Sequence, residues 1–295
     1  MNKELEKFGR LKENVDLKNY NTYKLSSHAR YLIEVKDEDS LVKLLEYLNS
    51  NNMSYYVLGN GSNVVIPEED FDGVIIKLNE FNVIDIDDDE VTVGSGVMLP
   101  KLVNECVNNC LTGLEWASGI PGTVGGSVVG NAGAYLSEIF DFIISVRVLE
   151  NGVIKELKKA DIEHSYRHTS FQGRKDIIIL SVRLKLEKGN CDESLNLMKK
   201  RMERRLESQP LEYPSAGSTF RNPEGDYAGR LIEECGLKGK TIGGAMVSTK
   251  HANFIINYDK ASPKDIRDLI KLVHDTVLEK TGIDLILEQE LIDWR

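Results

Sequence analysis

The stretch Ser118-Gly-Ile-Pro-Gly-Thr-Val-Gly-Gly-Ser127, continued by Gly130-Asn-Ala-Gly133, is the most informative part of this chain. It holds six glycines in sixteen residues. Because glycine has no bulky side chain, its amide N–H groups can face an anion and a flat ligand can approach the main chain. The composition therefore predicts a phosphate-binding loop. A glycine-rich segment packed beneath a close helix is the other interpretation that these residues allow.

A second glycine segment lies earlier in the chain, at Gly59-Asn-Gly-Ser-Asn63, directly after a predicted strand at 55–58. Successive amides in such a segment can form a small anion-binding concavity. It is not a Rossmann fingerprint, because Val64-Val-Ile-Pro67 follows where that fingerprint requires a helix. Alone, the segment is equally well a tight turn between strands. Together, the two glycine segments favour one extended diphosphate ligand.

Hydrophobic periodicity around the glycine segments predicts a mixed α+β fold. A leucine stripe at helical spacing predicts a helix over 39–48, between strands at 31–35 and 55–58. Asn151-Gly152 predicts a two-residue hairpin, and Ser262-Pro263 predicts the start of a helix that continues to 280. Further strands are expected at 63–66, 73–78, 83–86, 91–93, 142–150, 153–157, 177–186, 254–257 and 285–287, and further helices at 99–110, 192–207 and 228–235. We place the main domain boundary near residue 190.

Composition and charge exclude several classes of protein. The 295 residues carry 47 acidic and 37 basic side chains, a net charge of −10, and such a surface repels nucleic acid. The basic run between Lys199 and Arg205 alternates with apolar residues at helical spacing, which is typical of a solvated helix face. No stretch approaches the roughly 18 consecutive apolar residues of a membrane helix. The charged N-terminal residues lack the apolar core of a signal peptide. We therefore expect a cytoplasmic protein that binds neither nucleic acid nor membrane.

The cysteines and histidines give no metal-binding pattern. The four cysteines include no C-x-x-C pair, and in a reducing compartment they are expected to be buried thiols. His164 and His168 are four residues apart and could in principle share a metal on one helical face. Arg167 between them would repel a cation, and no acidic third ligand is evident beside them. We expect no metal site.

The glycine segments carry a resemblance to one family. G-N-G-S-N at Gly59–Asn63, S-G-I-P-G-T-V-G-G at Ser118–Gly126 and N-A-G-A-Y at Asn131–Tyr135 resemble the FAD domain of UDP-N-acetylenolpyruvoylglucosamine reductases. That domain has the vanillyl-alcohol-oxidase type of FAD-binding fold, and Asn21-Thr-Tyr23 also resembles the opening of the family. The resemblance implies an FAD-binding domain of two α+β subdomains at 1–190, split near residue 80, and a smaller α+β substrate-binding domain at 191–295. It implies that FAD is bound by Gly59, Asn60, Gly61, Ser62, Asn63, Pro121, Gly122, Thr123, Gly125, Gly126, Asn131 and Gly133.

Three later segments carry residues suited to reducing an enolpyruvyl ether. In Ser165-Tyr-Arg-His-Thr-Ser-Phe171, an arginine in a polar turn has the planar fork that binds a carboxylate, although a surface ion pair is the plainer interpretation. The segment resembles the family motif Y-R-x-S-x-F, which implies that Arg167 is catalytic and Tyr166 binds substrate. Thr169 stands where the family usually has serine.

The other two segments are Ala216-Gly-Ser-Thr-Phe-Arg-Asn-Pro223 and Leu287-Glu-Gln-Glu-Leu291. Taken alone, they are a turn hydroxyl and a solvated acidic strand. They resemble A-G-S-x-F-K-N-P and L-x-x-E-V, which implies that Ser218 is the proton donor and Glu290 the catalytic carboxyl, with Glu288 in reserve. Gln289 stands where some relatives carry proline. The resemblance also implies substrate binding by Arg221, Asn222 and Asn253, the last in His251-Ala-Asn-Phe-Ile-Ile-Asn257.

The resemblance extends from about Asn21 to Glu290 and implies a function. The family reduces UDP-N-acetylglucosamine enolpyruvate to UDP-N-acetylmuramate with NADPH through FAD, in peptidoglycan precursor synthesis, and this chain resembles the smaller subtype that lacks a tyrosine loop. We expect non-covalent FAD, because no histidine or cysteine lies inside a glycine segment. We expect no partner beyond the two substrates, and a monomer or weak homo-oligomer. The alternatives are an FAD-dependent oxidase of the same fold acting on a sugar or alcohol, and a non-catalytic nucleotide-binding module.

Overall fold

The computed structural model describes residues 2–294 and divides them into two compact units, each built from separate pieces of the chain. The first unit comprises residues up to Glu13, Arg30–Gly59 and Asp72–Glu203. The second comprises Asn14–Ala29, Asn60–Phe71 and residues from Arg204 onward. The units therefore interleave along the sequence, whereas the predicted domains divide once, at 190/191. The assignment of FAD and substrate to those domains stays a prediction.

The first unit contains a four-stranded sheet in the order β1-β2-β5-β3, covered by helix α2. The helices and strands in this part of the unit are α1 Asn2–Leu5, β1 Gly9–Asp16, β2 His28–Val35, α2 Glu38–Ser50, β3 Tyr55–Val57 and β5 Phe71–Lys77. The leucine stripe of α2, namely Leu41, Leu44, Leu45 and Leu48, packs on the sheet beside Ile33 and Ile76, as the spacing predicted. The helix begins at Asp37, whose carboxylate accepts the amide of Ser40.

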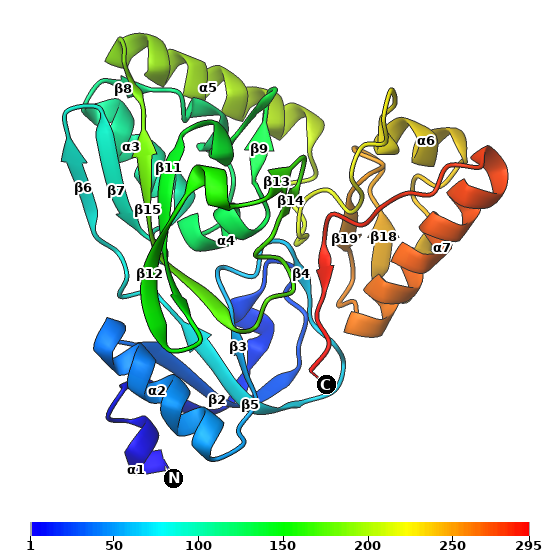
Figure 1. Ribbon diagram of the computed structural model, residues 1–295. Helices are drawn as coiled ribbons and strands as arrows, with labels where there is room; N and C mark the ends of the chain where they lie inside the picture. The colour runs from blue at the N-terminus through cyan, green and yellow to red at the C-terminus, as the bar shows by residue number, and fades with distance from the viewer. Residues whose placement is uncertain (1, 295) are drawn as a thin grey trace. The chain divides into compact units, whose positions relative to one another are not determined.

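The second sheet of this unit is five-stranded and antiparallel, in the order β12-β11-β15-β7-β6 (Figure 1). Its strands are β6 Ile84–Asp87, β7 Glu90–Gly94, β11 Ile143–Glu150, β12 Val153–Lys158 and β15 Ile177–Lys185. Asn151 and Gly152 both have positive φ, +51° and +78°, which is the hairpin that this dipeptide predicted. The register pairs Glu150 with Val153 across that turn.

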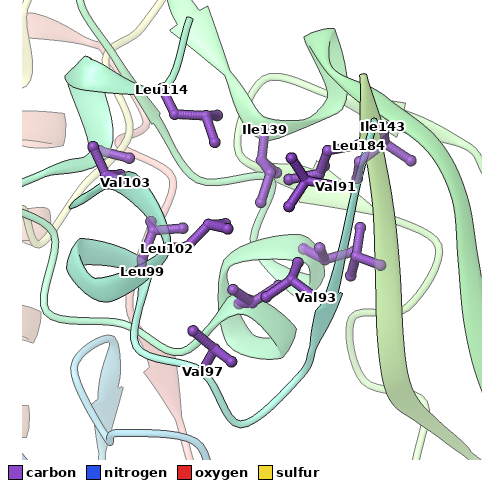
Figure 2. Packing of buried hydrophobic residues seen from close by; sticks show 14 of the residues in the cluster. Val91, Val93, Val97, Leu99, Leu102, Val103, Leu114, Ile139, Ile143 and Leu184 are labelled. Atoms are coloured by element: carbon purple, nitrogen blue, oxygen red, sulfur yellow. The ribbon is translucent and has the colours of Figure 1, made fainter. Parts of the chain in front are cut away.

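Helices α3 (Leu99–Asn108) and α4 (Val124–Val129) complete the core of the first unit. Figure 2 shows Leu99, Leu102 and Val103 of α3 packed with Val91 and Val93 of β7 in one apolar cluster. α4 contacts β7 and β15, so the glycine segment that contains this helix lies against the sheet. The shorter elements are β8 Leu111–Thr112, β9 Gly133–Ala134, β10 Ser137–Glu138, β13 His164–Ser165, β14 His168–Thr169, β16 Glu187–Lys188 and the single-turn helices Glu115–Ala117, Ile139–Asp141 and Lys159–Asp161.

The second unit is a small three-stranded sheet, β17-β18-β19, against which α7 packs (Figure 1). Ser262 and Asp265 form a capping box at the start of α7, Pro263 is its first residue, and Gly282 ends it at φ +73°. The bounds are β17 Thr241–Ile242, β18 Ala245–Val247, β19 Ile255–Asn257, α6 Ala228–Glu234, α7 Pro263–Thr281, β4 Val64–Val65, β20 Glu290–Leu291 and the single turn Leu17–Tyr20. Helix α5, Cys191–Ser208, runs from the first unit into the second.

Two sequence-based expectations are wrong. The last strand is β20 at Glu290–Leu291, and Leu287 forms only an isolated bridge to Phe220 within the expected strand at 285–287. His164 and His168 lie on opposite strands of the β13–β14 hairpin, so the helical face considered for a metal does not exist there. Cys110 and Cys191 form a disulfide, whereas Cys106 and Cys235 are buried thiols as expected. These two bridged cysteines are 81 residues apart, which is why local spacing did not reveal them.

No helix within residues 2–294 combines the length and apolar character needed to cross a bilayer.

Candidate active site

The glycine segment Gly59–Asn63 leaves most of its amides open. The N–H groups of Gly59, Gly61, Ser62 and Asn63 make no hydrogen bond to another residue within 2–294. Gly61 has φ +65°, and a Cβ there would lie 2.2 Å from the carbonyl oxygen of Tyr20, so only glycine fits. Consecutive open amides are what an anion-binding nest requires. Gly59 belongs to the first unit and the rest of the segment to the second.

The second glycine segment uses its own amides far more than its composition predicted. The amides of Val124 and Gly125 donate to the carbonyls of Val97 and Ser95, at 2.8 and 2.9 Å. The amides of Gly126 and Ser127 donate to Thr123, which caps the start of α4. Among the described residues, the amides of Gly122 and Thr123 have no such partner. Fewer amides are therefore open to an anion than the glycine content predicted, and those of Gly122 and Thr123 lie near the beginning of the segment.

Two glycines of the second segment have no packing reason to be glycine. A Cβ on Gly126 would meet only the Thr123 hydroxyl, at 3.4 Å, and one on Gly130 only the Gly126 carbonyl, at 3.7 Å. By contrast, a Cβ on Gly125 would lie 2.9 Å from the Ser95 side chain. The fold thus requires Gly125 but leaves space at Gly126 and Gly130. Such space is expected where a cofactor approaches the main chain.

The two glycine segments meet within the first unit at Gly59 and Thr123. A Cβ on Gly59 would lie 2.8 Å from the Thr123 hydroxyl oxygen. Behind this contact, the ammonium of Lys77 donates to the carbonyl oxygen of Gly59. Lys77 is only 6% exposed, and burial lowers its pKa to about 8 while the charge of Glu34 opposes that shift. A buried cation therefore stands behind the first peptide of the open-amide segment.

Arg167 lies at the tip of the β13–β14 hairpin, in a left-handed conformation with φ +55°. Its guanidinium donates to the carbonyl of Asn131, at 3.3 Å, and to that of Gly133. The guanidinium also lies over the ring of Tyr166, 4.9 Å from its centroid. Strained backbone at a non-glycine residue is frequent at functional sites. The predicted position of Arg167, in a turn between strands, is confirmed.

Two buried side chains hold the arginine hairpin on the second glycine segment. The Asn131 side-chain amide donates to the carbonyl of Ser165 at 2.8 Å, and the Thr169 hydroxyl donates to the carbonyl of Val129 at 2.7 Å. Both residues are fully buried. The side-chain oxygen of Asn131 has no hydrogen-bond partner within the described chain. The structure thus brings Arg167 together with two predicted cofactor residues, Asn131 and Gly133.

In the second unit, the serine and glutamate segments are hydrogen-bonded to each other. Phe220 pairs with Leu287 in an antiparallel bridge, and the amide of Glu288 donates to the carbonyl of Thr219 at 2.9 Å. Ser218 is half-buried, and its hydroxyl makes no hydrogen bond to another residue between 2 and 294. Glu290 is exposed. The main chain is therefore fixed while the serine hydroxyl stays available to a substrate.

The glutamate segment also joins the first glycine segment. β20 and β4 are parallel neighbours that pair Glu290 with Val64, and the Glu290 amide donates to the carbonyl of Asn63 at 2.9 Å. The Asn63 side chain in turn donates to the carbonyl of Glu288 at 3.0 Å. Ser218, Glu290 and Asn63, predicted separately from three distant segments, thus lie on directly bonded pieces of chain. Glu288 and Glu290 flank the buried Gln289, so both carboxylates point away from the interior, as strand alternation predicted.

The predicted substrate-binding residues differ in how many hydrogen bonds and ion pairs their side chains already make within the protein. Arg221 forms no ion pair within the described residues, and its Nε is buried without a partner, so its charge is available to an anion. The Asn222 oxygen accepts the amide of Ala228 at 3.1 Å, at the start of α6. Asn253 is 4% exposed, and both ends of its amide bond to the main chain of Phe220. The substrate contact of Asn253 stays a prediction, although its amide already holds the serine segment.

Sequence reasoning missed Lys77, Tyr23 and Gln289 as parts of the site. Lys77 closes the apolar run Val74-Ile-Ile76, and a lone charge in such a run is a signal of a buried partner. Tyr23 and Gln289 are buried and bond to each other at 3.0 Å across 266 residues of sequence. No spacing rule reaches that far.

Comparisons with known proteins identify the family of this chain. The family model described as FAD binding domain matches residues 29–158, and the model described as UDP-N-acetylenolpyruvoylglucosamine reductase, C-terminal domain, matches 209–292. UDP-N-acetylenolpyruvoylglucosamine reductases from Caldanaerobacter subterraneus subsp. tengcongensis and Anoxybacillus flavithermus are 40% and 41% identical to this chain. The alignments cover 98% and 96% of this chain and 96% and 95% of those proteins.

Solved structures give the same result. The crystal structure of UDP-N-acetylenolpyruvylglucosamine reductase from Thermus caldophilus superimposes with a TM-score of 0.83 at 35% identity, over 97% of this chain and 100% of that one. A grass pollen allergen with glucose dehydrogenase activity, Phl p 4, matches 62% of this chain and 43% of its own with a TM-score of 0.50 at 16% identity, which shows a shared fold alone. The expected α+β fold with an FAD-binding domain of the vanillyl-alcohol-oxidase type is confirmed. This chain belongs to the UDP-N-acetylenolpyruvoylglucosamine reductase family, with that family's FAD-binding and C-terminal domains.

Proposed function

We propose that this protein reduces UDP-N-acetylglucosamine enolpyruvate to UDP-N-acetylmuramate, with NADPH as reductant and non-covalently bound FAD as the hydride carrier. The observation that carries the proposal is the bonded arrangement of the second unit. There, a proton-donor candidate, a carboxyl candidate and an open-amide segment suited to a diphosphate lie on adjoining pieces of chain. The product is a peptidoglycan precursor, so the activity would serve cell-wall biogenesis and, through it, cell shape and division.

The residues present fit FAD. In the first unit, the open amides of Gly122 and Thr123 are suited to an anion such as the FAD diphosphate, and in the second unit those of Gly61, Ser62 and Asn63 are as well. The space beside Gly126 and Gly130 would admit the flat parts of the cofactor. The remaining predicted cofactor residues are Gly59, Pro121, Gly125, Asn131 and Gly133 in the first unit and Asn60 in the second. When bound, FAD supplies the hydride that it has received from NADPH.

The chain itself must bind the substrate carboxylate and deliver a proton. Arg167 stays cationic throughout and presents several N–H donors, so we assign it to the carboxylate of the enolpyruvyl group, beside Tyr166. Ser218 donates its hydroxyl proton to C2 and recovers a proton from solvent, which together with the hydride balances the addition across the double bond. A serine is a weak acid, but position matters before pKa when the acceptor is a reactive carbanion.

Glu290 is assigned to the charge that develops on the carboxylate side of the substrate. Arg221 and Asn222 are assigned to the diphosphate of the sugar nucleotide, because the Arg221 charge has no acidic partner among the described residues. The monomeric or weakly oligomeric state and the cytoplasmic location also remain predictions.

The proposal is tested first on the purified protein. An oxidised flavin spectrum is expected, with all the flavin released into the supernatant on denaturation. NADPH oxidation under anaerobic conditions should run to one equivalent of bound FAD and continue only when the enolpyruvyl sugar nucleotide is added. A protein that instead transferred electrons from a sugar or alcohol to oxygen would be the oxidase alternative. A preparation that binds no FAD would exclude both enzymes.

The serine assignment has its own test. In Ser218→Ala, stopped-flow reduction of FAD by NADPH should remain within about twofold of the wild-type rate. Reoxidation of the reduced flavin by the enolpyruvyl substrate should fall by at least a hundredfold, the range that a placed acid contributes. Unchanged reoxidation would show that Ser218 is not the proton donor.

A further inference from the structure

Ser218 is held from one side by a side chain that contributes no catalytic group. The side-chain amide nitrogen of Gln289 donates to two successive carbonyls, those of Ala216 and Gly217, each at 3.2 Å. These are the two peptides before Ser218, and Gly217 has φ +75°, the left-handed angle that turns the chain there. Fixing both carbonyls fixes the turn from which the serine side chain projects.

Tyr23 determines which way the Gln289 amide points. The Tyr23 hydroxyl donates to the Gln289 side-chain oxygen at 3.0 Å, so the amide nitrogen must face the serine turn. Tyr23 is fully buried and Gln289 is 3% exposed, so water cannot replace either partner. Burial also raises the pKa of Tyr23, which keeps the hydroxyl protonated as a donor throughout the physiological range.

The same glutamine lies between the two candidate carboxylates. Its main-chain neighbours Glu288 and Glu290 point outward because Gln289 points inward. The amide of Glu288 bonds to the carbonyl of Thr219, just after the serine. A movement of the Gln289 side chain would therefore displace the serine turn and the carboxylate strand together.

We propose that Tyr23 and Gln289 form a buried clamp that positions the Ser218 hydroxyl for proton delivery. The clamp rests on the proposed function, because it acts through Ser218. Neither Tyr23 nor Gln289 touches the substrate; both are positioning residues. The clamp acts by preorganising the reacting group, because a displacement of about 1 Å at such a group can lower the rate a hundredfold.

The variant that tests the clamp is Tyr23→Phe, which removes one hydroxyl and keeps the ring. Anaerobic reduction of FAD by NADPH should stay within twofold of wild type, since it needs no proton from Ser218. Reoxidation by the enolpyruvyl sugar nucleotide should fall tenfold to a hundredfold. Its solvent deuterium isotope effect should rise, because proton transfer becomes the slower step. Gln289→Met, which retains bulk but removes both amide ends, should give the same pattern and keeps the test valid if one variant folds poorly.

A double-mutant cycle separates positioning from stability. If Tyr23 acts through the serine, Tyr23→Phe should change reoxidation by less than twofold in the Ser218→Ala background. The control is Val277→Ala, which removes buried contacts from α7 and should lower the melting temperature without altering either half-reaction beyond twofold. Reoxidation within twofold of wild type in Tyr23→Phe would overturn the clamp. So would effects that multiply with Ser218→Ala, or that slow both half-reactions equally. If Ser218→Ala itself reoxidises normally while Tyr23→Phe does not, the serine assignment fails, and the clamp as stated fails with it.

Discussion

The arginine hairpin and the serine turn differ in whether cations take part in holding them. In the first unit, cationic side chains bond to glycine carbonyls, Arg167 to Gly133 and Lys77 to Gly59, in addition to the neutral bonds of Asn131 and Thr169. Around the serine turn of the second unit, neutral amides do the same work, with Gln289 holding Ala216 and Gly217 and Asn253 holding Phe220. Cations of the second unit also bond to main chain, but away from the serine turn: Arg267 at Val65 and Ile292, Lys250 at Leu206 and Lys280 at Cys235.

This difference follows from what each region is expected to bind. A carboxylate or a diphosphate is favoured by a fixed positive charge nearby, so a cation that also holds the loop has two uses. A serine that must deliver its proton to one carbon atom depends above all on a fixed position. Variants of the first region should therefore respond to charge and pH, and variants of the second to hydrogen-bond geometry.

The largest effect is expected for Arg167→Lys. Lysine keeps the charge but lacks the planar fork, so it cannot hold the Gly133 and Asn131 carbonyls and still present two donors to a carboxylate. The value of kcat/KM for the enolpyruvyl substrate should fall by at least a hundredfold, or about 3 kcal/mol of transition-state binding. Steady-state kinetics with NADPH measures this.

The matched control for that prediction is Arg174→Lys. Arg174 is an exposed arginine of the same unit that pairs with Asp176 and Glu150, and surface pairs contribute little. Its kcat/KM should stay within twofold of wild type. If Arg167→Lys also stayed within threefold, charge alone would suffice at the hairpin and the contrast between the two regions would disappear.

Lys77 should make the stability of the first region depend on pH, in a direction that its pKa fixes. The folded-state pKa is about 8, below the ordinary lysine value of 10.5, so between these values the unfolded chain binds more protons than the folded one. The contribution of Lys77 to the free energy of unfolding is therefore lowest below pH 8, and it rises as pH increases toward 10.5. The unfolding free energy of FAD-free wild type minus that of Lys77→Met should increase by about 2 kcal/mol between pH 7.5 and pH 10.

Urea unfolding of the two proteins at each pH measures that difference, and groups common to both cancel. The conservative Lys77→Arg keeps its charge at every pH in this range, so its stability relative to Lys77→Met should stay level. A difference between wild type and Lys77→Met that stayed level, or that fell as pH rose, would show that Lys77 is not a buried cation.

The sequence predicted local features of both regions well and long-range ones poorly. Asn151-Gly152 and Ser262-Pro263 specify a turn and a helix start through their own backbone preferences, so neighbouring residues sufficed. The positions of Arg167 and Ser218 followed from motif resemblance. The partners that hold the serine turn did not, because the Tyr23–Gln289 pair spans 266 residues. The Cys110–Cys191 disulfide elsewhere in the molecule spans 81 and was missed for the same reason.

The glycine segments show that the sequence alone does not predict which amides stay open. Composition identified the segment from Ser118 onward as a source of amides, yet the cap on Thr123 and the bonds to Val97 and Ser95 use most of them. Which amides stay open depends on what the strands before the segment present to it. The set of open amides is therefore a property of the packed unit, and the number of glycines does not predict it.

Gly126→Ala should change FAD affinity and folding stability in opposite directions. The space beside Gly126 accepts a methyl group, and alanine suits the interior of α4 better than glycine, so FAD-free protein should gain about 0.5–1 kcal/mol of stability. FAD affinity should nevertheless fall by about tenfold, or 1.4 kcal/mol, if the cofactor occupies that space. Flavin fluorescence titration gives the affinity and urea unfolding the stability. Gly125→Ala, which meets the Ser95 side chain at 2.9 Å, should lose stability without FAD as well.

The smallest effect is expected for Thr169→Val, which removes the hydroxyl that bonds to the Val129 carbonyl and keeps the shape of the side chain. One buried carbonyl then lacks its partner, so the unfolding free energy should fall by about 1–2 kcal/mol. Arg167 keeps its own two bonds to the glycine segment, so kcat/KM should change by less than threefold. Because the cation holds the hairpin directly, losing a neutral bond here should matter less to rate than losing the Tyr23 hydroxyl in the second unit. A Thr169→Val enzyme that retained its stability but lost tenfold in kcat/KM would reverse that order. The neutral bonds would then set the geometry of both regions, with the cations serving only as charge.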